Sequence, residues 1–485
     1  MDNNSRAIMI AAPESGAGKT SISLGLMAAF KGEGWAVQPF KVGPDYIDPG
    51  FHRHVCSRLS HNLDSWLISP SYLRYLWSHK IRDADSAIVE GVMVLYDGAG
   101  PDTNRGSSAE IAEMLDIPVL LAIDAGGMAR SAAALVSGYS QFCRDINLAG
   151  VIANRVGSRG YYELVAEAVE KETGIPCVGY LPRDLPVDIP ERHLGLVPAA
   201  EIERLEESLD RLGREVSEKF QLNKIMQLSE EAGLSTKDDI REQDKEKPAA
   251  EVRKGLKFLS SSRSSQSRSE STAGKPGRGL RIGVARDEAF SFHYQANLDL
   301  LIELGCELIE FSPLADKKLE TDLDGIYLAG GFPEVFAEEL SANKSFRCHL
   351  KQELNSGLVC FAECGGFMYL LAEICSEAGE CQSMVGYFPG RAVMTDSLQN
   401  FGYVEVNLPG NPGLRGHEFH YSRLEGAEGL PFRGKIKRQR RGDERQGMAV
   451  KNNVLAGYPH LHFYSNPEFL AHWLNLCAGE VNSWL

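Results

Sequence analysis

The chain has 485 residues, of which 43% are hydrophobic and 24% are charged, the usual proportions of a folded globular protein. One hydrophobic core rarely serves so long a chain, so we expect two or three domains. The formal net charge of −15 argues against general binding to nucleic acids or anionic membranes, but it allows a local basic pocket for an anionic small molecule.

Several features predict a cytoplasmic protein. No run approaches the roughly 20 apolar residues of a membrane-spanning helix. The N-terminal residues do not have the layout of a signal peptide. The ten cysteines are scattered without metal-ligand spacing, which favours reduced thiols over a disulfide framework.

Short apolar runs alternate with amphipathic stretches from residue 7 to about residue 200. Several runs are continuous in Val, Ile and Leu, which is typical of strands buried on both faces. The pattern predicts an α/β domain with a mostly parallel sheet. The predicted strands are 8–11, 37–41, 86–90, 119–123 and 150–153, and a helix is predicted over 201–225.

A glycine-rich sequence at 12–20 follows the first predicted strand and precedes a helix. Its Gly16, Gly18, Lys19 and Thr20 match the phosphate-binding loop GxxxxGK[ST], although a proline stands at the first glycine position. In such loops backbone N–H groups hold phosphate oxygens, the lysine reaches the β- and γ-phosphates, and the hydroxyl binds Mg²⁺. An incidental glycine-rich turn is the less favoured interpretation, so we predict ATP and Mg²⁺ as ligands.

Carboxylates follow the next predicted strands. Asp45 and Asp48 lie in a glycine- and proline-bounded loop that begins at Lys41, and Glu90 ends the strand 86–90. Ligands of α/β sheets bind at the carboxyl ends of the strands. Asp45 and Asp48 suit a metal or a substrate, although the same residue types form ordinary turns. Glu90 suits Mg²⁺ or its water, and Asp64 is a weaker candidate.

The composition changes between residues 226 and 278, where Lys, Glu, Ser and Arg dominate. Such a segment buries too little apolar surface to offset its ordering entropy, so we expect a flexible linker. The α/β alternation then restarts, which predicts domains at 1–225 and 279–485. The second domain has predicted strands at 280–285, 307–311, 325–328 and 357–362, a helix at 296–304 and a hairpin around Gly442-Asp443.

Cys364 stands between a predicted buried strand and Gly365-Gly366, which open a helix. This strand–elbow–helix arrangement exposes a nucleophile, and the helix N-terminus is expected to lower the thiol pKa. A buried, inert cysteine is the alternative for an isolated Cys, and it is our interpretation of the other nine. The Gly330-Gly331 turn offers N–H groups for an oxyanion hole. The candidates for the general base are His417, His420, His460 and His462.

Together these motifs resemble the cobyrinic acid a,c-diamide synthase family over nearly the whole chain outside 226–278. The resemblance implies an N-terminal P-loop domain like dethiobiotin synthetase and a C-terminal class-I-like glutaminase domain, joined by a flexible linker. The matching stretches are Ala12–Thr20, Gln38–Phe51, Asn62–Trp66, Val89–Gly98, Leu181–Pro198, Gly283–Phe290, Ala362–Leu370, Arg415–Ser422 and Tyr458–Phe463.

The resemblance also implies a reaction, the ATP- and glutamine-dependent amidation of the a and c acetate carboxylates of cobyrinate, a corrin, in cobalamin biosynthesis. ATP would convert the carboxylate to an acyl phosphate, and ammonia from glutamine would reach it through a passage between the domains. By matched position Cys364 is the nucleophile and His460 its base. Lys19, Thr20 and Lys41 would bind nucleotide phosphates and metal, Asp64 and Glu90 would hold Mg²⁺, and Asp45 and Asp48 would act on the substrate carboxylate.

Two alternatives remain at this stage. The same machinery would serve hydrogenobyrinate or nickel-sirohydrochlorin, because only the pocket would differ. A P-loop ATP-switch protein with an inactive glutaminase domain belongs to another class. Such proteins usually carry a second lysine early in the loop, where this chain has Pro13-Glu14, and intact Cys364 and His460 also argue against it. The expected partners are small molecules, with a homodimer left open.

Overall fold

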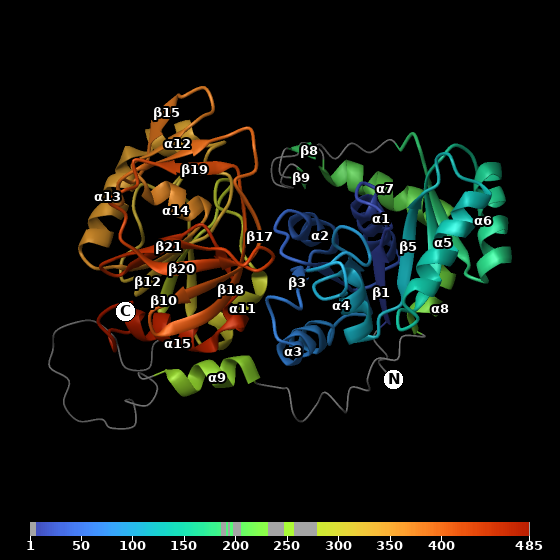
Figure 1. Cartoon of the computed structure of the whole chain (residues 1–485), viewed down its shortest axis with the longest axis horizontal. Coiled ribbons are helices and arrows are strands. Elements are labelled where there is room, and N and C mark those ends of the chain that lie inside the picture. Colours follow the sequence, from blue (N-terminus) through green and yellow to red (C-terminus); the bar gives the residue numbers. More distant parts are fainter. Residues whose placement is uncertain are drawn as a thin grey trace. The chain divides into compact units, whose positions relative to one another are not determined.

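The computed structural model describes residues 6–185, 191–192, 195–196, 205–230, 247–256 and 279–484. The chain divides into two compact units, Met1–Lys245 and Glu246–Leu485. Both units are α/β, as the alternation of apolar runs and amphipathic stretches predicts (Figure 1). Within the described ranges, no helix has both the length and the apolar character to cross a membrane.

The first unit is built on a seven-stranded sheet whose neighbouring strands are all parallel. Most residues of these strands are buried, as expected for a sheet covered on both faces. The sheet order is β3 (His61–Leu63), β2 (Val37–Val42), β4 (Ser86–Glu90), β1 (Arg6–Ala11), β5 (Val119–Asp124), β6 (Leu148–Val156) and β7 (Cys177–Pro182). A separate short hairpin pairs β8 (Glu191–Arg192) with β9 (Gly195–Leu196).

The helices of the first unit follow the strands in turn. They are α1 (Lys19–Gly32), α2 (Asp48–Cys56), α3 (Pro70–Lys80), α4 (Ser108–Leu115), α5 (Arg130–Phe142), α6 (Arg159–Thr173), α7 (Leu205–Lys219) and α8 (Leu222–Glu230). One core joins apolar side chains of α1, α7 and α8 to those of the central strands. Two glycines let α1 and α7 approach closely: a Cβ atom on Gly25 would lie 2.5 Å from Val216 Cγ2, and one on Gly213 would lie 2.9 Å from Ala28 Cβ.

The structure corrects the predicted helix at 201–225, which is two helices, α7 and α8. The break comes at Phe220, which bridges to Gly179 of β7, and the next amide, of Gln221, donates to Val178 O. Residues 201–204 lie outside the described residues. Strands β3 and β7 were not predicted. The three residues of β3 include a histidine and an asparagine, so no apolar run marks the strand.

The second unit contains a ten-stranded mixed sheet. Its parallel half holds the four predicted strands, and its antiparallel half includes the hairpin predicted around Gly442-Asp443. The order is β11 (Glu307–Phe311), β10 (Arg281–Ala285), β12 (Gly325–Leu328), β13 (Val359–Glu363), β22 (Val454–Gly457), β21 (Glu444–Lys451), β20 (Phe432–Arg438), β17 (Asn400–Leu408), β18 (Asn411–His420) and β23 (His460–Leu461).

A four-stranded sheet orders β15 (Cys381–Ser383), β14 (Glu373–Cys375), β16 (Arg391–Met394) and β19 (Ser422–Glu425). Cys375 and Cys381 lie opposite each other across β14 and β15 and form a disulfide bond. The expectation of reduced thiols is therefore wrong for this pair. Pairing across a hairpin depends on strand register, which the spacing of the cysteines did not reveal.

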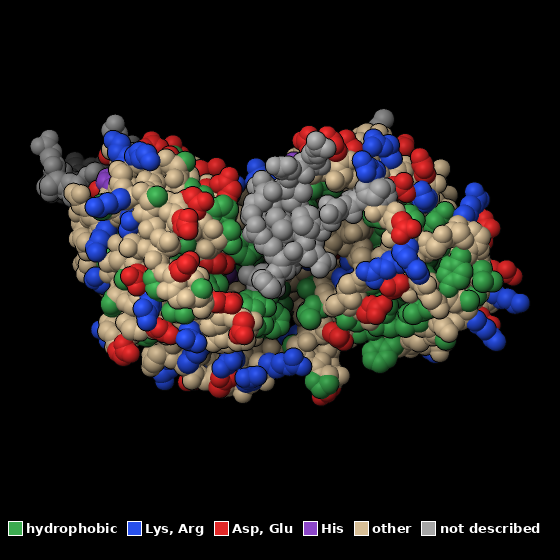
Figure 2. All heavy atoms as spheres, turned by 90° about the horizontal axis from the view of Figure 1, so that it is seen from above, with side chains coloured by type: hydrophobic (Ala, Val, Ile, Leu, Met, Phe, Trp, Pro, Cys, Tyr) green, Lys and Arg blue, Asp and Glu red, His purple; other side chains and the backbone are tan. Residues whose placement is uncertain are grey.

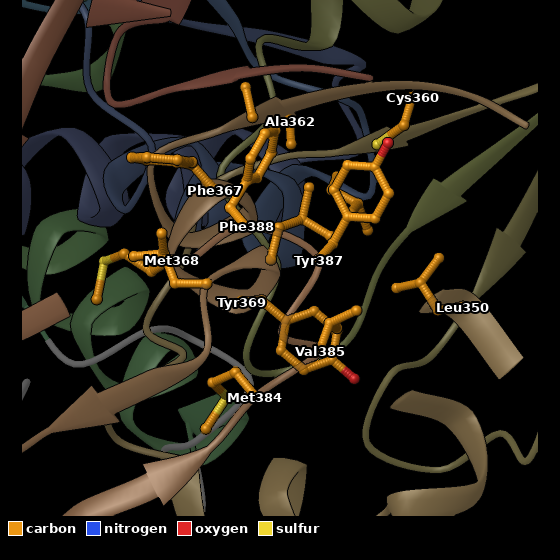
Figure 3. Close-up of a cluster of buried hydrophobic side chains, with 14 of the residues drawn as sticks. Leu350, Cys360, Ala362, Phe367, Met368, Tyr369, Met384, Val385, Tyr387 and Phe388 are labelled. Carbon is orange, nitrogen blue, oxygen red and sulfur yellow. The ribbon is translucent and has the colours of Figure 1, made fainter. Parts of the chain in front are cut away.

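The helices of the second unit are α9 (Lys247–Gly255), α11 (Gln295–Glu303), α12 (Ala337–Ala342), α13 (Lys344–Asn355), α14 (Gly365–Leu370) and α15 (Pro467–Cys477), with a 3₁₀ turn η2 at Phe463–Ser465. The side chains of α14 pack in a large apolar core with β13 and the segment 384–388 (Figure 3). Phe367, for example, meets the ring of Phe388 edge-on with 6.3 Å between centroids. This core anchors the residues that follow Cys364.

Part of the segment assigned to a linker is helical. Residues 226–230 end α8, and α9 lies at 247–255, whereas 231–246 and 257–278 lie outside the described residues. Ala249, Val252 and Leu256 are buried, and Asn475 of α15 donates to the Gly255 carbonyl. The spacing of these three apolar residues forms a short helical stripe within a charged sequence.

On the face of the molecule in Figure 2, acidic and basic side chains are interspersed.

The close approach of α1 and α7 predicts that a methyl group added at Gly25 destabilises the protein, whereas a methyl group added to a glycine at an open helical position does not. We expect Gly25→Ala to lower the free energy of unfolding by about 1–3 kcal/mol, because the added methyl group overlaps Val216. Gly138→Ala in α5 is the matched control, because nothing lies within 4 Å of its Cβ position. It should stabilise the protein by up to about 1 kcal/mol through helix propensity. Denaturant titration checks both, and equal effects would contradict the packing argument.

Candidate functional site

The predicted phosphate loop lies between β1 and α1, with Gly16 and Gly18 in the left-handed region at φ 78° and 91°. A Cβ atom on Gly18 would lie 2.1 Å from Asn154 Nδ2, and that amide donates to Ala17 O over 2.7 Å. Glycine is therefore required at position 18 by backbone conformation and by space. Asn154, at the end of β6, was not identified from the sequence.

A buried charged cluster lies beside this loop, at the carboxyl ends of β2 and β4. Glu90 Oε1 accepts hydrogen bonds from Thr20 Oγ1 at 2.6 Å and from Lys41 Nζ at 2.9 Å. Lys41 also pairs with Asp48 at the start of α2. The structure thus brings together four of the residues singled out in the sequence. The ammonium of Lys19 donates to Met93 O in the loop after β4.

Lys41 and Glu90 stabilise each other's charges, whereas burial and the neighbouring carboxylates of Asp45 and Glu90 raise the pKa of Asp48. Burial by itself lowers the pKa of Lys41, but the carboxylates of Asp48 and Glu90 outweigh it and raise that pKa above its usual value. Burial likewise raises the pKa of Glu90, yet the Lys41 ammonium and hydrogen bonds from His52 and Thr20 hold it below its ordinary range. Burial and the neighbouring Lys41 charge lower the pKa of Lys19. Lys41 and Glu90 therefore form an ion pair inside the protein.

His52 completes the cluster and was not identified from the sequence. Its Nε2 lies 2.8 Å from Glu90 Oε2, its Nδ1 lies 3.1 Å from Ser60 Oγ, and its side chain is fully buried. His52 stands four residues after Asp48 in α2, which places the two on the same face of the helix. That spacing from a predicted site residue is the signal that could have found it.

Asp45 and Asp64 lie at the same edge of the sheet but bind backbone amides. Asp45 Oδ1 accepts from the amides of Ile47 and Asp48, each at 2.9 Å. Asp64 Oδ1, just beyond β3, accepts from Trp66 and Leu67 at 2.9 and 2.8 Å. The oxygens of Thr20 and Glu90 are adjacent, and hard oxygen donors suit Mg²⁺, so the residues present fit this metal.

A pocket of about 550 Å³ adjoins the phosphate loop. Arg155 donates to Asp124 at 2.6 Å and to the Gly16 carbonyl at 2.9 Å, which ties the pocket wall to the loop. Its volume lies within the range of small-molecule sites, roughly 300–1,000 Å³. It is lined by Glu14, Asp124, Gly126, Gly127, Met128, Arg155 and Arg183.

Cys364 lies at a sharp turn between β13 and α14. Its backbone is at φ 44° and ψ −106°, a conformation that costs a non-glycine residue energy and that occurs at functional sites. The Cys364 amide donates to Gly457 O at the end of β22. A Cβ atom on Gly366 would lie 2.2 Å from Leu328 O, so only glycine allows this approach. The predicted elbow is present.

The chain brings His460 to the same edge of the sheet. Gly457 ends β22 and pairs with Glu363, and His460 begins β23 three residues later. A Cβ atom on Gly330 would lie 2.2 Å from His460 Cε1, and one on Gly365 would lie 3.0 Å from the Gly331 amide nitrogen. The Gly330-Gly331 turn therefore contacts both the elbow and His460. Its predicted role as an oxyanion hole stays a prediction.

The other candidate bases have different surroundings. His417 pairs with His460 across β18 and β23. His420 stacks on Tyr458 with centroids 3.8 Å apart and bonds to Ser422 O. His462 Nδ1 accepts from the Tyr464 amide. Among the four candidates, His460 is therefore the one whose ring packs against the Gly330 turn.

Electrostatics correct one expectation about Cys364. Burial, and next the carboxylate of Glu334, raise the pKa of the Cys364 thiol above its usual value, whereas the sequence had predicted a lowered pKa. A helix start alone does not offset the loss of water around a buried thiolate. Burial lowers the pKa of His460 to about 3. The resting pair is a neutral thiol and a neutral imidazole, which is able to accept a proton.

Comparison with known proteins finds a different family model in each of the two units. Residues 8–197 match the CobQ/CobB/MinD/ParA nucleotide binding domain, and residues 281–468 match the CobB/CobQ-like glutamine amidotransferase domain. The first match covers the phosphate loop and the Glu90 cluster. The second covers Cys364 and His460.

Similar proteins match over almost their full length. The chain is 40% identical to the cobyrinate a,c-diamide synthase of Priestia megaterium, with 98% of each chain covered. It is 39% identical to that of Caldanaerobacter subterraneus subsp. tengcongensis, with 98% of this chain and 99% of the relative covered. It is 40% identical to that of Listeria innocua, with 96% of this chain and 97% of the relative covered. The chain therefore belongs to the cobyrinate a,c-diamide synthase family, and it is a ligase with glutamine as its amide donor.

Proposed function

We propose that the chain amidates the a and c acetate carboxylates of cobyrinate, with ATP forming an acyl phosphate and glutamine supplying ammonia at Cys364. The observation that carries the proposal is the buried cluster of Lys41, Asp48 and Glu90 beside the phosphate loop, in a chain that also has a cysteine elbow. The relatives named above are cobyrinate a,c-diamide synthases, which favours this substrate.

The first unit would bind and orient ATP. Loop amides and Lys19 hold the phosphates, and the adjoining pocket offers space for the nucleoside. Thr20, Glu90 and Asp64 would hold Mg²⁺, which neutralises phosphate charge when bound. Lys41, kept protonated by Asp48 and Glu90, supplies a fixed positive charge for the transferring phosphoryl group.

The substrate carboxylate would attack the γ-phosphorus of ATP, giving an acyl phosphate and ADP. Asp45 and Asp48 would orient this carboxylate from the start of α2. Asp48 does so indirectly, because it holds the Lys41 ammonium in place. Without Asp48, Lys41 would lose one of the carboxylates that favour its charged form, and the counter-charge for the anionic substrate would be less firmly held.

The second unit would release ammonia. The Cys364 thiol gives its proton to His460 and attacks the amide carbon of glutamine, and His460 returns the proton to the departing ammonia. Water then hydrolyses the thioester to glutamate. Ammonia attacks the acyl phosphate, forming the amide and releasing inorganic phosphate.

A substrate panel tests the proposal. Cobyrinate, hydrogenobyrinate and nickel-sirohydrochlorin, each labelled with ¹⁸O in the carboxylates, are incubated with ATP, Mg²⁺ and glutamine. We expect amidation of cobyrinate and transfer of one ¹⁸O per amide into inorganic phosphate, because an acyl phosphate breaks the original C–O bond. Unlabelled phosphate would contradict the acyl phosphate. Preference for another tetrapyrrole would contradict the substrate.

Substitution of the nucleophile should separate the two activities. We expect Cys364→Ala to abolish glutamine-dependent amidation and to retain amidation with ammonium chloride at high pH, because only ammonia release needs the thiol. Cys360→Ala, in the buried interior of β13, is the matched control and should keep both activities. Product masses give the readout. Failure of ammonia to restore amidation would contradict a separate glutaminase step.

The pH dependence of alkylation checks the state of the thiol. Because burial raises the pKa of Cys364, its reaction with iodoacetamide should be slow near neutral pH and should keep rising up to about pH 10. The exposed Cys348 is the reference thiol in the same sample. Peptide mass spectrometry measures both rates. Faster labelling of Cys364 than of Cys348 at neutral pH would show a resting thiolate instead.

A further inference from the structure

Glu363 immediately precedes Cys364 and has its carboxyl group deep inside the second unit, with 1% of the residue exposed. Glu363 Oε1 accepts from the amide of Leu461 at 2.6 Å, and Oε2 accepts from the Tyr327 hydroxyl at 2.7 Å. Both donors are neutral groups. A buried carboxyl group without a counter-charge is costly, so its place beside the elbow calls for an explanation.

Asn297 of α11 binds the same backbone from the other side. Its Nδ2 donates to Leu461 O at 2.9 Å, and its Oδ1 accepts from the Phe463 amide at 2.8 Å. Asn297 is fully buried. Glu363, Tyr327 and Asn297 come from β13, β12 and α11, and together we call them the Leu461 clamp.

The clamp acts on a very short strand. β23 consists of His460 and Leu461 alone, and it pairs with β18 through these two residues. Just beyond it, the His462 amide donates to Arg415 O over 3.1 Å. The clamp fixes both the N–H and the C=O of Leu461, the residue after His460. Glu363 thus bonds next to His460 and is covalently joined to Cys364.

We propose that Glu363 is a positioning residue for the glutaminase reaction, which sets His460 in place relative to Cys364 through the backbone of Leu461. This inference rests on the proposed function, in which these two residues are base and nucleophile. The Glu363 side chain spans from the elbow to β23 and so couples the positions of Cys364 and His460. A shift of one strand end therefore moves both residues. Tyr327 and Asn297 keep that side chain and its backbone target from rotating.

The acceptor oxygen, not a negative charge, carries this role. Burial raises the pKa of Glu363 to about 8, so the neutral acid is well populated near neutral pH. Glutamine has the same shape, accepts from the Leu461 amide through its oxygen and donates to Tyr327 through its nitrogen. Alanine removes the acceptor and leaves the Leu461 amide buried without a partner. This destabilises the native position of the backbone at Leu461.

The test compares Glu363→Ala, Glu363→Gln and Asn297→Ala with the wild-type full-length enzyme. The matched control is Asn343→Ala, because Asn343 is also buried and also binds backbone groups through both ends of its amide, at Asp316 O and the Phe346 amide, but it caps α13. Glutamate release gives kcat and KM for glutamine. Amidation with ammonium chloride and the melting temperature are recorded for each variant.

We expect Glu363→Ala and Asn297→Ala to lower kcat for glutamate release by about 10- to 100-fold, the effect of displacing a catalytic group by about 1 Å, with KM and ammonia-dependent amidation little changed. Glu363→Gln should restore most of kcat. Asn343→Ala should lower the melting temperature without this loss of kcat.

Three outcomes would overturn the positioning role: unchanged kcat in Glu363→Ala, no recovery in Glu363→Gln, or an equal loss of kcat in Asn343→Ala. If the wild-type enzyme releases no glutamate, or if Cys364→Ala releases it normally, the proposed function fails, and the positioning role fails with it. Normal wild-type turnover with an insensitive Glu363→Ala variant rejects the positioning role alone.

Discussion

Both units place their candidate site residues where parallel strands end, and both candidate sites depend on this placement. In the first unit β1 leads into the phosphate loop, while Lys41 and Glu90 lie at the ends of β2 and β4. In the second, β13 leads into Cys364 and β22 leads toward His460. Because parallel strands share one carboxyl edge, residues far apart in the sequence meet there without any further element.

The two sites tolerate buried ionisable groups in different ways. In the first unit Glu90 is ionised, and its charge is matched by Lys41 and by hydrogen bonds from Thr20 and His52. Such a fixed pair supplies a preorganised electrostatic field to any group bound beside it. In the second unit Glu363, in contact with neutral donors, has a raised pKa. Hydrogen bonds from neutral groups thus hold Glu363, whereas an ion pair holds Glu90.

The second feature that the two sites share is a glycine at which another side chain closely approaches the backbone. Gly18 admits Asn154 against the phosphate loop, and Gly330 admits the ring of His460. In each case a Cβ atom would occupy space that a neighbouring side chain now fills. The left-handed backbone of Cys364 adds strain at the one residue proposed to react, and the apolar core around α14 holds it.

The sequence by itself determined the local frames. The glycines around Lys19 and Cys364, each between an apolar run and a helix, predict a loop and an elbow because a few adjacent residues define such turns. Tertiary structure alone decided how distant segments meet: His52 on Glu90, Asn154 on Gly18, and Glu363 on Leu461. It also reversed the expected shift of the Cys364 pKa, because burial is a property of the packed core and not of the residues next to the cysteine.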